Sequence, residues 1–367
     1  MRSVARVLHI EISEGIGGIE TFLLNIYRNI DRSKVQFDFV SSKDKTAIEE
    51  EITELGGRIY KIKYGNVWGY YYQLLHLIST NKYTVVHIHK NSAANIIPFL
   101  ACKRAGVKII IAHAHNTRPS RGKVTGILHY INRPILNVVC NEKMACSNLA
   151  ALWMFGKRVV GKKKVKYIKN GIEIERFAYH AETRMMIREK LGLLEDTFVI
   201  GNVGRMTRQK NQSFLVDILS EVKKEYKNTK LLICGEGDLE NEILHRAEEL
   251  HVEDSLIMPG RCNNINEMLQ AMDVYVMPSL YEGLTVAAVE AQCAGLPTLI
   301  SDMMSEETVL LKTCKILSLK ASAREWAEHV LEYKDVKREY TGNEIKRAGY
   351  DVKKTADYMQ KFYVSKM

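Results

Sequence analysis

Two glutamates, Glu282 and Glu290, lie in the segment 278–297, whose residue types and spacing suggest the clearest chemistry in this sequence. A Pro-Ser turn leads to Glu282, and the mostly apolar residues 284–294 are typical of a helix that Gly295 ends. If both glutamates are helical, they lie about 12 Å apart. Carboxylates accept hydrogen bonds from sugar hydroxyls, and free N–H groups at a helix start bind phosphate. The segment therefore fits a nucleotide-sugar, although Glu282 could instead cap the helix or offset its dipole.

Two cations, Arg205 and Lys210, lie in the loop 201–211, between an expected strand and an expected helix. Both can converge on one anion, because Arg205 supplies a bidentate fork and Lys210 a compact charge. Such a pair would neutralise a leaving diphosphate. The alternative is that one or both pair with carboxylates at the surface.

Glycine-rich turns follow strands in both halves of the chain. Gly17 and Gly18 lie in the loop 14–20, where glycine would let the backbone approach a phosphate closely. A tight turn explains this loop equally well. Gly235 and Gly237 form another strand-to-helix turn, which we interpret mainly as structural, with the nucleotide at its border.

Histidines come in two pairs, His87 with His89 and His113 with His115, each at the end of an expected strand. We assign His89, His113 and the adjacent Lys90 to the acceptor side, and expect one histidine of the second pair to face the ligand. The alternative is that these are ordinary core or surface histidines. Neither pair has helical metal-ligand spacing or a nearby acidic ligand, so we predict no zinc site.

The elements that must position these residues alternate between short β-rich runs and longer helical patterns, which is typical of βαβ units and parallel sheets. Expected strands in the first half are 4–10, 36–41, 58–62, 84–88, 108–113, 138–140, a weak one at 143–146, and 165–168. A second series begins with strands at 197–202, 230–234, 255–258, 273–277 and 297–300. We place the domain boundary near residue 175, which gives domains 1–175 and 176–345 and a terminal helical segment 346–367.

The net charge of +10 is unevenly distributed along the 367 residues. Residues 1–170 hold 27 Lys and Arg against 11 Asp and Glu, and no acidic residue lies between Arg58 and Asn141. The run 157–166 is strongly basic. This half is suited to an anionic membrane, a pyrophosphate-bearing lipid or nucleic acid, or its charge simply forms a solvated face.

The seven cysteines are scattered without a Cys-x-x-Cys pair, which argues for a reducing compartment and against disulfides. No uninterrupted apolar run reaches membrane-spanning length, and the N-terminus leads directly into a strand rather than a signal peptide. We therefore expect a cytoplasmic protein, with peripheral contact at the inner face of the plasma membrane.

Taken in chain order, these motifs resemble the retaining, metal-independent glycosyltransferases of family 4, which have the GT-B architecture. The motifs are Gly17-Gly18, the histidine that ends a mid-domain strand, Asn170-Gly171-Ile172, Gly204-Arg205, Lys210-Asn211, Gly235-x-Gly237, and Glu282 with Glu290. The stretches 21–28 and 290–297 look like the bacterial exopolysaccharide and capsule branch. The resemblance implies an α/β fold of two Rossmann-like doubly wound domains facing across a cleft, with the last helix returning to the first domain.

The resemblance also implies roles for individual residues. Glu290 would bind the ribose hydroxyls and Glu282 a hydroxyl of the donor sugar. The implied donor-binding set is Gly17, Gly18, Gly204, Gly235, Gly237, Gly283, Leu284, Thr285 and Glu290. The implied catalytic set is Glu282, Arg205, Lys210 and His115, with the two cations stabilising the departing diphosphate. Thr285 stands where the family often has proline, so the sugar preference is left open.

The leading hypothesis is transfer of a hexose or N-acetylhexosamine from a nucleotide-sugar, most simply a UDP-sugar, to a lipid-linked or saccharide acceptor. In this family the acceptor hydroxyl is thought to attack from the leaving-group face, assisted by the diphosphate, so no protein nucleophile, metal or cofactor is expected. A nucleotide-sugar epimerase on the same fold is the alternative enzyme. A nucleic-acid-binding protein is disfavoured, because the basic half lacks interleaved aromatic residues.

Overall fold

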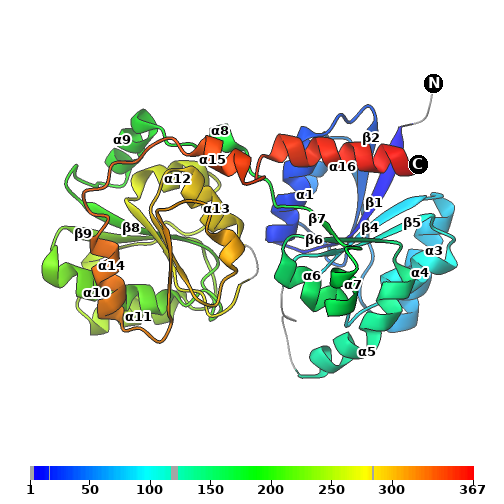
Figure 1. Ribbon diagram of the computed structural model, residues 1–367, viewed down its shortest axis with the longest axis horizontal. Coiled ribbons are helices and arrows are strands. Elements are labelled where there is room, and N and C mark those ends of the chain that lie inside the picture. Colours follow the sequence, from blue (N-terminus) through cyan, green and yellow to red (C-terminus); the bar gives the residue numbers. More distant parts are fainter. Residues whose placement is uncertain (1–3, 16, 117–122, 283–284) are drawn as a thin grey trace. The chain divides into compact units, whose positions relative to one another are not determined.

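The computed structural model describes residues 4–15, 17–116, 123–282 and 285–367. The chain forms two compact units (Figure 1): unit 1 comprises Met1–Gly171 and Asp351–Met367, and unit 2 comprises Ile172–Tyr350. The division falls just before the boundary that we placed at residue 175. The terminal segment 346–367 is itself divided, because its first residues belong to unit 2. No helix among the described residues is long and apolar enough to cross a membrane.

Unit 1 is built on a seven-stranded parallel sheet with the order β3-β2-β1-β4-β5-β6-β7. Its strands are β1 (Ala5–Ile12), β2 (Val35–Ser41), β3 (Arg58–Lys61), β4 (Val85–Lys90), β5 (Ile109–Ala114), β6 (Glu142–Ala145) and β7 (Lys166–Tyr167). The central strands are apolar and buried, as expected for a parallel sheet covered on both faces. The chain order reverses between β1 and β4, the switch point at which such sheets bind ligands.

Helices cover both faces of this sheet. They are α1 (Gly18–Asn29), α2 (Glu49–Glu54), α3 (Val67–Thr80), α4 (Ile97–Arg104), α5 (Lys123–Val139), α6 (Asn148–Phe155), α7 (Lys157–Gly161) and α16 (Val352–Lys366). The last helix, α16, packs beside α1, and its Met359 and Tyr363 are buried in the same core cluster as Phe22 and Tyr27. The end of the chain therefore completes the core of unit 1.

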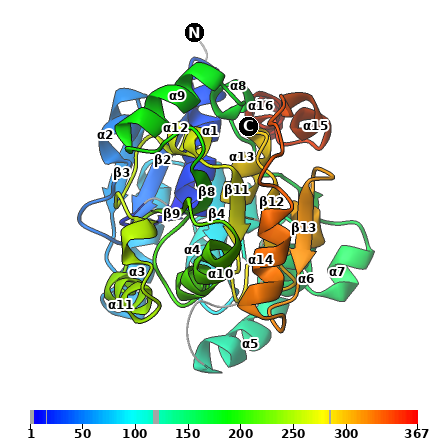
Figure 2. The ribbon, with the colours of Figure 1, turned by 90° about the vertical axis from the view of Figure 1, so that its left-hand side faces the viewer.

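Unit 2 contains a six-stranded parallel sheet with the order β10-β9-β8-β11-β12-β13, part of which is seen side by side in Figure 2. Its strands are β8 (Phe198–Val203), β9 (Thr229–Cys234), β10 (Leu256–Ile257), β11 (Val274–Met277), β12 (Thr298–Ser301) and β13 (Cys314–Leu317). Its helices are α8 (Ile174–Phe177), α9 (Ala181–Lys190), α10 (Gln212–Glu225), α11 (Glu240–Glu249), α12 (Ile265–Ala271), α13 (Val286–Cys293), α14 (Ala323–Leu331) and α15 (Gly342–Arg347). The switch point of this sheet lies between β8 and β11.

The structure differs from the sequence-based assignments in one expected strand, one further strand and the start of one helix. The strand expected at 138–140 is absent: α5 continues through Val139, with Val138 exposed, and the strand that follows is β6. The edge strand β13 was not expected. The helix that we began at residue 284 begins at Val286, so Glu282 precedes it and the two glutamates do not share one helix.

Candidate functional site

Two loops at the switch point of unit 2 hold the residues that stand out chemically. One joins β8 to α10, and the other joins β11 to α13. The N–H of Leu280 donates to the carbonyl of Gln209 at 2.8 Å, and the Asn211 side chain donates to the carbonyl of Pro278 at 3.1 Å. Asn211 adopts the left-handed conformation (φ 58°), which asparagine tolerates better than most residues. These contacts fix the two loops against each other.

Lys210 and Glu282 are brought together by this arrangement. The Lys210 Nζ lies 2.7 Å from the Glu282 Oε1, and both side chains are largely shielded from solvent. The separation is that of an ion pair, although Oε1 accepts no hydrogen bond of good geometry from a described residue. The sequence left open whether Lys210 pairs with a surface carboxylate. It does pair with a carboxylate, but that carboxylate belongs to Glu282, itself a candidate site residue.

Glu290 lies inside α13, on the carboxyl side of the same loop. Burial raises the pKa of its carboxyl to about 7, partly opposed by the positive charge of Arg176. The helix ends as predicted at Gly295 (φ 70°), where the N–H of Leu296 donates to the carbonyl of Ala291. Among the described residues, the Glu290 carboxyl has no hydrogen-bond or ion-pair partner, so it is able to bind hydroxyl donors.

Tyr275 on β11 is a further buried polar group at this switch point, and it was not singled out from the sequence. Its hydroxyl contacts the carbonyl and the N–H of Val203 at 3.3 and 3.4 Å, at the end of β8. Burial, with the charges of Glu290 and Glu282, raises the pKa of Tyr275 well above its ordinary value. Both carboxylates therefore act electrostatically on one hydroxyl. In the sequence, Tyr275 is only one residue of an apolar strand, and nothing in that pattern distinguishes it.

The glycines of unit 2 have a packing explanation. A Cβ atom on Gly235 would lie 2.1 Å from the carbonyl oxygen of Gly204, and one on Gly237 would lie 2.4 Å from that of Met206. The N–H of Gly204 donates to the carbonyl of Cys234 at 3.0 Å, so the two turns are in close backbone contact. Only glycine at 235 and 237 leaves room for the backbone of the loop that carries Arg205 and Lys210.

The structure gives no side-chain contact that ties the remaining predicted residues of unit 2 to the Lys210–Glu282 pair. Arg205 is exposed at the start of the β8–α10 loop. Thr285 is buried at the N-cap of α13, and its side chain makes no capping hydrogen bond to a described residue. Gly283 and Leu284 lie outside the described residues.

Unit 1 contains a histidine cluster (His9, His87, His89, His113 and His115) at its own switch point. His9 on β1 joins the two pairs that the sequence showed. The His9 Nδ1 and His89 Nε2 atoms are 3.0 Å apart, and the His89 Nδ1 and His115 Nε2 atoms are 2.9 Å apart. A parallel chain runs from the Tyr363 hydroxyl to His87 and on to His113, at 2.6 and 3.2 Å.

Burial holds this cluster in the neutral form. It lowers the pKa of His9 and of His115 to about 3 and lowers the pKa values of His87, His89 and His113 well below the ordinary range. Of the five, only His115 is partly exposed. Its Nδ1 atom is buried and, like the Nε2 atoms of His9 and His113, has no hydrogen-bond partner among the described residues.

The ring nitrogens of the histidine cluster converge in space, which is the first requirement of a metal site. The described residues include two triads, His9/His87/His89 and His89/His113/His115, whose nitrogens lie within 4.8 Å of one another. Sequence spacing alone is therefore a poor argument against zinc. The nitrogens that face each other are, however, engaged in ring-to-ring hydrogen bonds, and an ion would have to replace these bonds.

The predicted phosphate loop of unit 1 already has an internal acceptor for its N–H groups. The Glu20 carboxylate accepts from the N–H of Ser13 at 2.7 Å and from the N–H of Gly17 at 3.0 Å. Gly18, by contrast, has open space around its Cβ position. Any phosphate at Gly17 would have to compete with the negative charge of Glu20.

Lys90 forms an ion pair with Glu11, a residue that sequence reasoning missed. Glu11 has a φ of 78° at a bulge in β1, a strained conformation for a residue other than glycine. The Tyr64 hydroxyl also donates to this carboxylate. Burial lowers the pKa of Lys90 to about 7. The carboxyl edge of β1 and β4 thus carries a second cluster of polar groups beside the histidines.

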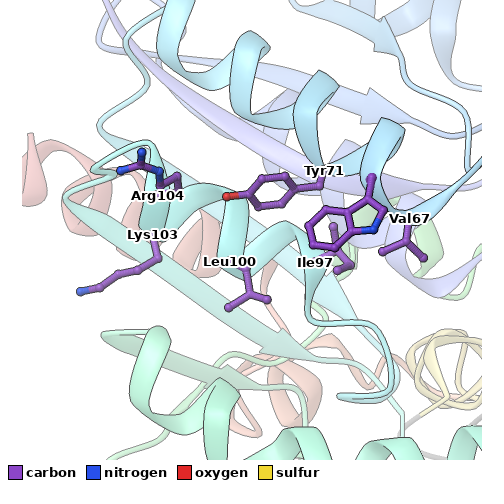
Figure 3. A pocket seen from close by; sticks show the side chains of 7 residues that line it. Val67, Tyr71, Ile97, Leu100, Lys103 and Arg104 are labelled. Atoms are coloured by element: carbon purple, nitrogen blue, oxygen red, sulfur yellow. The ribbon is translucent and has the colours of Figure 1, made fainter.

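A separate groove of about 540 Å³ lies on unit 1, lined by Val67, Trp68, Tyr71, Ile97, Leu100, Lys103 and Arg104 (Figure 3). These residues come from α3 and α4 and include none of the candidate residues. The groove is therefore not part of the candidate site.

Two doubly wound parallel sheets with polar loops at their switch points define the GT-B class of fold. Two family models match the chain, Glycosyltransferase Family 4 over residues 16–176 and Glycosyl transferases group 1 over residues 184–347. The chain is 32% identical over 372 residues to EpsF of Bacillus subtilis (strain 168), which is named as a glycosyltransferase. The match covers 98% of this chain and 97% of EpsF. The chain belongs to the family 4 glycosyltransferases.

Two further comparisons extend this result. An Escherichia coli UDP-Gal:alpha-D-GlcNAc-diphosphoundecaprenol alpha-1,3-galactosyltransferase is 30% identical over 236 residues, which are 63% of this chain and 60% of that enzyme. The crystal structure of Anabaena HepE in complex with UDP-glucose superimposes with a TM-score of 0.80 at 16% identity, covering 98% of this chain and 99% of HepE. The second comparison supports the fold alone.

Proposed function

We propose that this glycosyltransferase moves a hexose or N-acetylhexosamine from a UDP-sugar, with retention at the anomeric carbon, to a lipid-linked or saccharide acceptor in exopolysaccharide or capsule synthesis. The observation that carries the proposal is the Lys210–Glu282 ion pair together with the Glu290 carboxyl, which has no partner among the described residues, all at the switch point of unit 2. A cation and two carboxylates at one switch point match a donor in which a diphosphate separates two sugar rings.

The relatives support the donor and acceptor classes. The E. coli enzyme, by its name, uses UDP-galactose and a sugar carried on diphosphoundecaprenol. HepE has been crystallised with UDP-glucose. A lipid-linked acceptor would require work at a membrane surface, and the acid-poor sequence of unit 1 supplies the charge for peripheral contact with an anionic bilayer.

The proposed reaction uses the residues of unit 2 as follows. Glu290 accepts hydrogen bonds from the ribose hydroxyls, and Glu282 accepts one from a hydroxyl of the sugar. Lys210 and Arg205 stabilise the diphosphate as the bond between the anomeric carbon and the phosphate oxygen breaks. The acceptor oxygen forms its bond on the same face, and its proton passes to a phosphate oxygen. His115, the one partly exposed histidine of the cluster, would orient the sugar or the acceptor.

The test begins with donor binding, because this step needs no acceptor. UDP and UDP-sugars should raise the melting temperature of the purified protein, while ADP and GDP should not. Incubation with a UDP-sugar and membrane lipid extract should then give a glycosylated lipid whose new linkage, by NMR, has the anomeric configuration of the donor. Transfer should persist in EDTA. A protein that no nucleotide stabilises and that transfers no sugar would refute the proposal, and donor loss without acceptor would favour the epimerase.

A further inference from the structure

Two cysteines of unit 2, Cys234 and Cys262, form a pair of thiols. Cys234 ends β9 and is buried, whereas Cys262 lies in the loop 258–264 between β10 and α12 and is partly exposed. Both side chains pack in the same core cluster, and a hydrogen bond joins the two thiols. All seven cysteines belong to the described part of the chain, and the other five are buried. The one thiol open to solvent therefore has a second thiol as its neighbour.

The hydrogen bond makes the two thiols chemically unequal. It favours the thiolate of Cys262, which lowers the pKa of that residue, and it raises the pKa of Cys234, which burial raises further. By contrast, burial alone raises the pKa of Cys314 in the same unit to about 12. A thiolate is the nucleophile in thiol–disulfide exchange, and an accessible thiolate beside a second thiol is typical of cysteines that respond to oxidants. The pair is therefore suited to oxidation.

Backbone hydrogen bonds connect this pair to the β8–α10 loop of the candidate site. The N–H of Gly235, the residue after Cys234, donates to the carbonyl of Gly260 at 2.9 Å, and the Cys262 Sγ lies 3.6 Å from the same oxygen. On the other side, the carbonyl of Cys234 accepts from the N–H of Gly204 at 3.0 Å. A movement of the loop 258–264 can thus pass through the end of β9 to the start of the β8–α10 loop.

We propose that Cys262 is a modification site, at which a small-molecule disulfide oxidises the pair to a Cys234–Cys262 disulfide that displaces the β8–α10 loop. The Cys262 thiolate first attacks a sulfur of the oxidant, which forms a mixed disulfide and releases one thiolate. The Cys234 sulfur then attacks the Cys262 sulfur, and its proton passes to the second departing thiolate. Two electrons move from the protein to the oxidant, which leaves as two thiols.

The displacement follows from the length of the new bond. A disulfide bond of about 2.05 Å is shorter than any hydrogen bond between two sulfurs, so the loop 258–264 and the end of β9 must approach each other. The turn at Gly235 cannot absorb this movement freely, because its Cβ position already lies 2.1 Å from the Gly204 carbonyl oxygen. The expected consequence is weaker binding of the donor diphosphate, and this consequence rests on the proposed function.

The first test asks whether the disulfide forms, and it needs no nucleotide. The full chain is treated with hydroxyethyl disulfide, digested without reduction and analysed by mass spectrometry. The wild type should yield a peptide that links Cys234 to Cys262, and dithiothreitol should remove this link. Cys262→Ser should yield no linked peptide. The matched control is Cys314→Ala, which removes a buried cysteine of the same unit and should form the link as the wild type does.

The second test measures what the disulfide does to the loop. Without ligand, the amides of residues 204–211 should exchange with solvent faster in the oxidised wild type than in the reduced protein. UDP should bind the oxidised form at least about tenfold more weakly, because the charge-assisted hydrogen bond from Lys210 is misplaced, and dithiothreitol should restore the affinity. Cys262→Ser, treated in the same way, should keep the exchange rates and the UDP affinity of the reduced wild type.

Two results would overturn the inference. One is a Cys262 that stays reduced or carries only the mixed disulfide, and the other is a linked peptide whose formation leaves the exchange of residues 204–211 unchanged. Unchanged UDP affinity in the oxidised form would overturn the consequence for donor binding. If the reduced protein binds no UDP, the proposed function fails, while the linked peptide and the exchange rates still decide this inference.

Discussion

The Lys210 ammonium lies 2.7 Å from the carboxylate of Glu282, although the two residues are far apart in the sequence. The contact exists because β8 and β11 are neighbours at the switch point, and the loops that follow them meet. The charge of each side chain is neutralised by the other. A diphosphate would compete with Glu282 for the lysine, and a sugar hydroxyl would donate a hydrogen bond to the carboxylate, whose charge the lysine would then neutralise less fully.

Replacement of this lysine tests whether the ion pair serves catalysis. Lys210→Ala should lower kcat by about 100- to 1000-fold, the usual effect of removing one group that stabilises transition-state charge. It should also reduce the stabilisation by UDP, because the diphosphate loses a cation. Steady-state transfer assays and thermal melts measure the two effects.

The control is Lys224→Ala, which removes an exposed lysine paired with Glu221. Such a surface pair contributes about 0.5 kcal/mol or less, so both readouts should stay at wild-type values. Lys210→Arg should recover part of kcat, because it restores the charge. Wild-type activity in Lys210→Ala would show that the pair is only structural.

Glu290 should make the protein less stable as the pH rises. Its folded pKa of about 7 lies above the ordinary value of 4.5. Between these two pH values the folded state therefore keeps a proton that the unfolded chain releases. Glu290→Gln removes the penalty, and should raise the free energy of unfolding by about 1–2 kcal/mol near pH 8 and leave it unchanged near pH 4.5. Denaturant titrations at the two pH values measure this.

The same substitution should weaken UDP binding about tenfold, because the ribose hydroxyls lose a charged acceptor. A gain in stability together with a loss of binding is the expected sign of a functional residue. Glu248→Gln, at an exposed position on α11, should alter neither quantity. If Glu290→Gln binds UDP normally, the ribose assignment is wrong.

Much of the fold follows from the sequence, because the alternation of β-branched runs and amphipathic helices is strong in both units. The failure at 138–140 has a local cause: Val138 and Val139 have high strand propensity, but tertiary contacts of Asn137 keep them in α5. The weaker run at 142–145 becomes the strand because it pairs with β5.

The candidate site is only partly visible in the sequence. Glu282, Glu290 and Lys210 stand out through their motifs, but the motifs do not show that Lys210 and Glu282 touch. Tyr275 and His9 are missed for a related reason, since each is one polar group in an apolar strand whose neighbours come from distant strands. Such contacts depend on strand order, which hydrophobic periodicity does not encode.

The histidine cluster should make unit 1 sensitive to mild acid. The folded pKa values lie far below the ordinary 6.5, so the unfolded chain binds protons that the folded state excludes, and stability falls as the pH drops below about 6.5. Each such histidine contributes up to about 1.4 kcal/mol per pH unit. Hydrogen exchange near pH 5 should therefore accelerate in β4 and β5 before it does so in β8 and β11.

Substitution of one histidine of the cluster shows whether the cluster causes the acid sensitivity of unit 1. His9→Phe, which places an aromatic ring beside Phe37, should reduce proton uptake on unfolding by about one at pH 5. His245→Gln, on the exposed surface of α11, should leave the uptake unchanged. Equal acid sensitivity of both units would exclude the cluster as its origin. Zinc analysis of the same preparations would show whether the triads hold metal.

Gly235 provides the last test, because its role is steric. A Cβ atom at this position would lie 2.1 Å from the Gly204 carbonyl oxygen, and backbone cannot move aside as a flexible side chain can. Gly235→Ala should displace the β8–α10 loop and destabilise unit 2 by about 1–3 kcal/mol. It should also weaken UDP binding, since that loop carries Arg205 and Lys210. Gly126→Ala in α5 has open space at its Cβ position and should instead stabilise its helix by about 0.5–1 kcal/mol. Denaturant titration and UDP-dependent melting of the two variants separate the effect of replacing any glycine by alanine from the effect of this loop contact. Unchanged UDP binding in Gly235→Ala would mean that the loop does not position the donor.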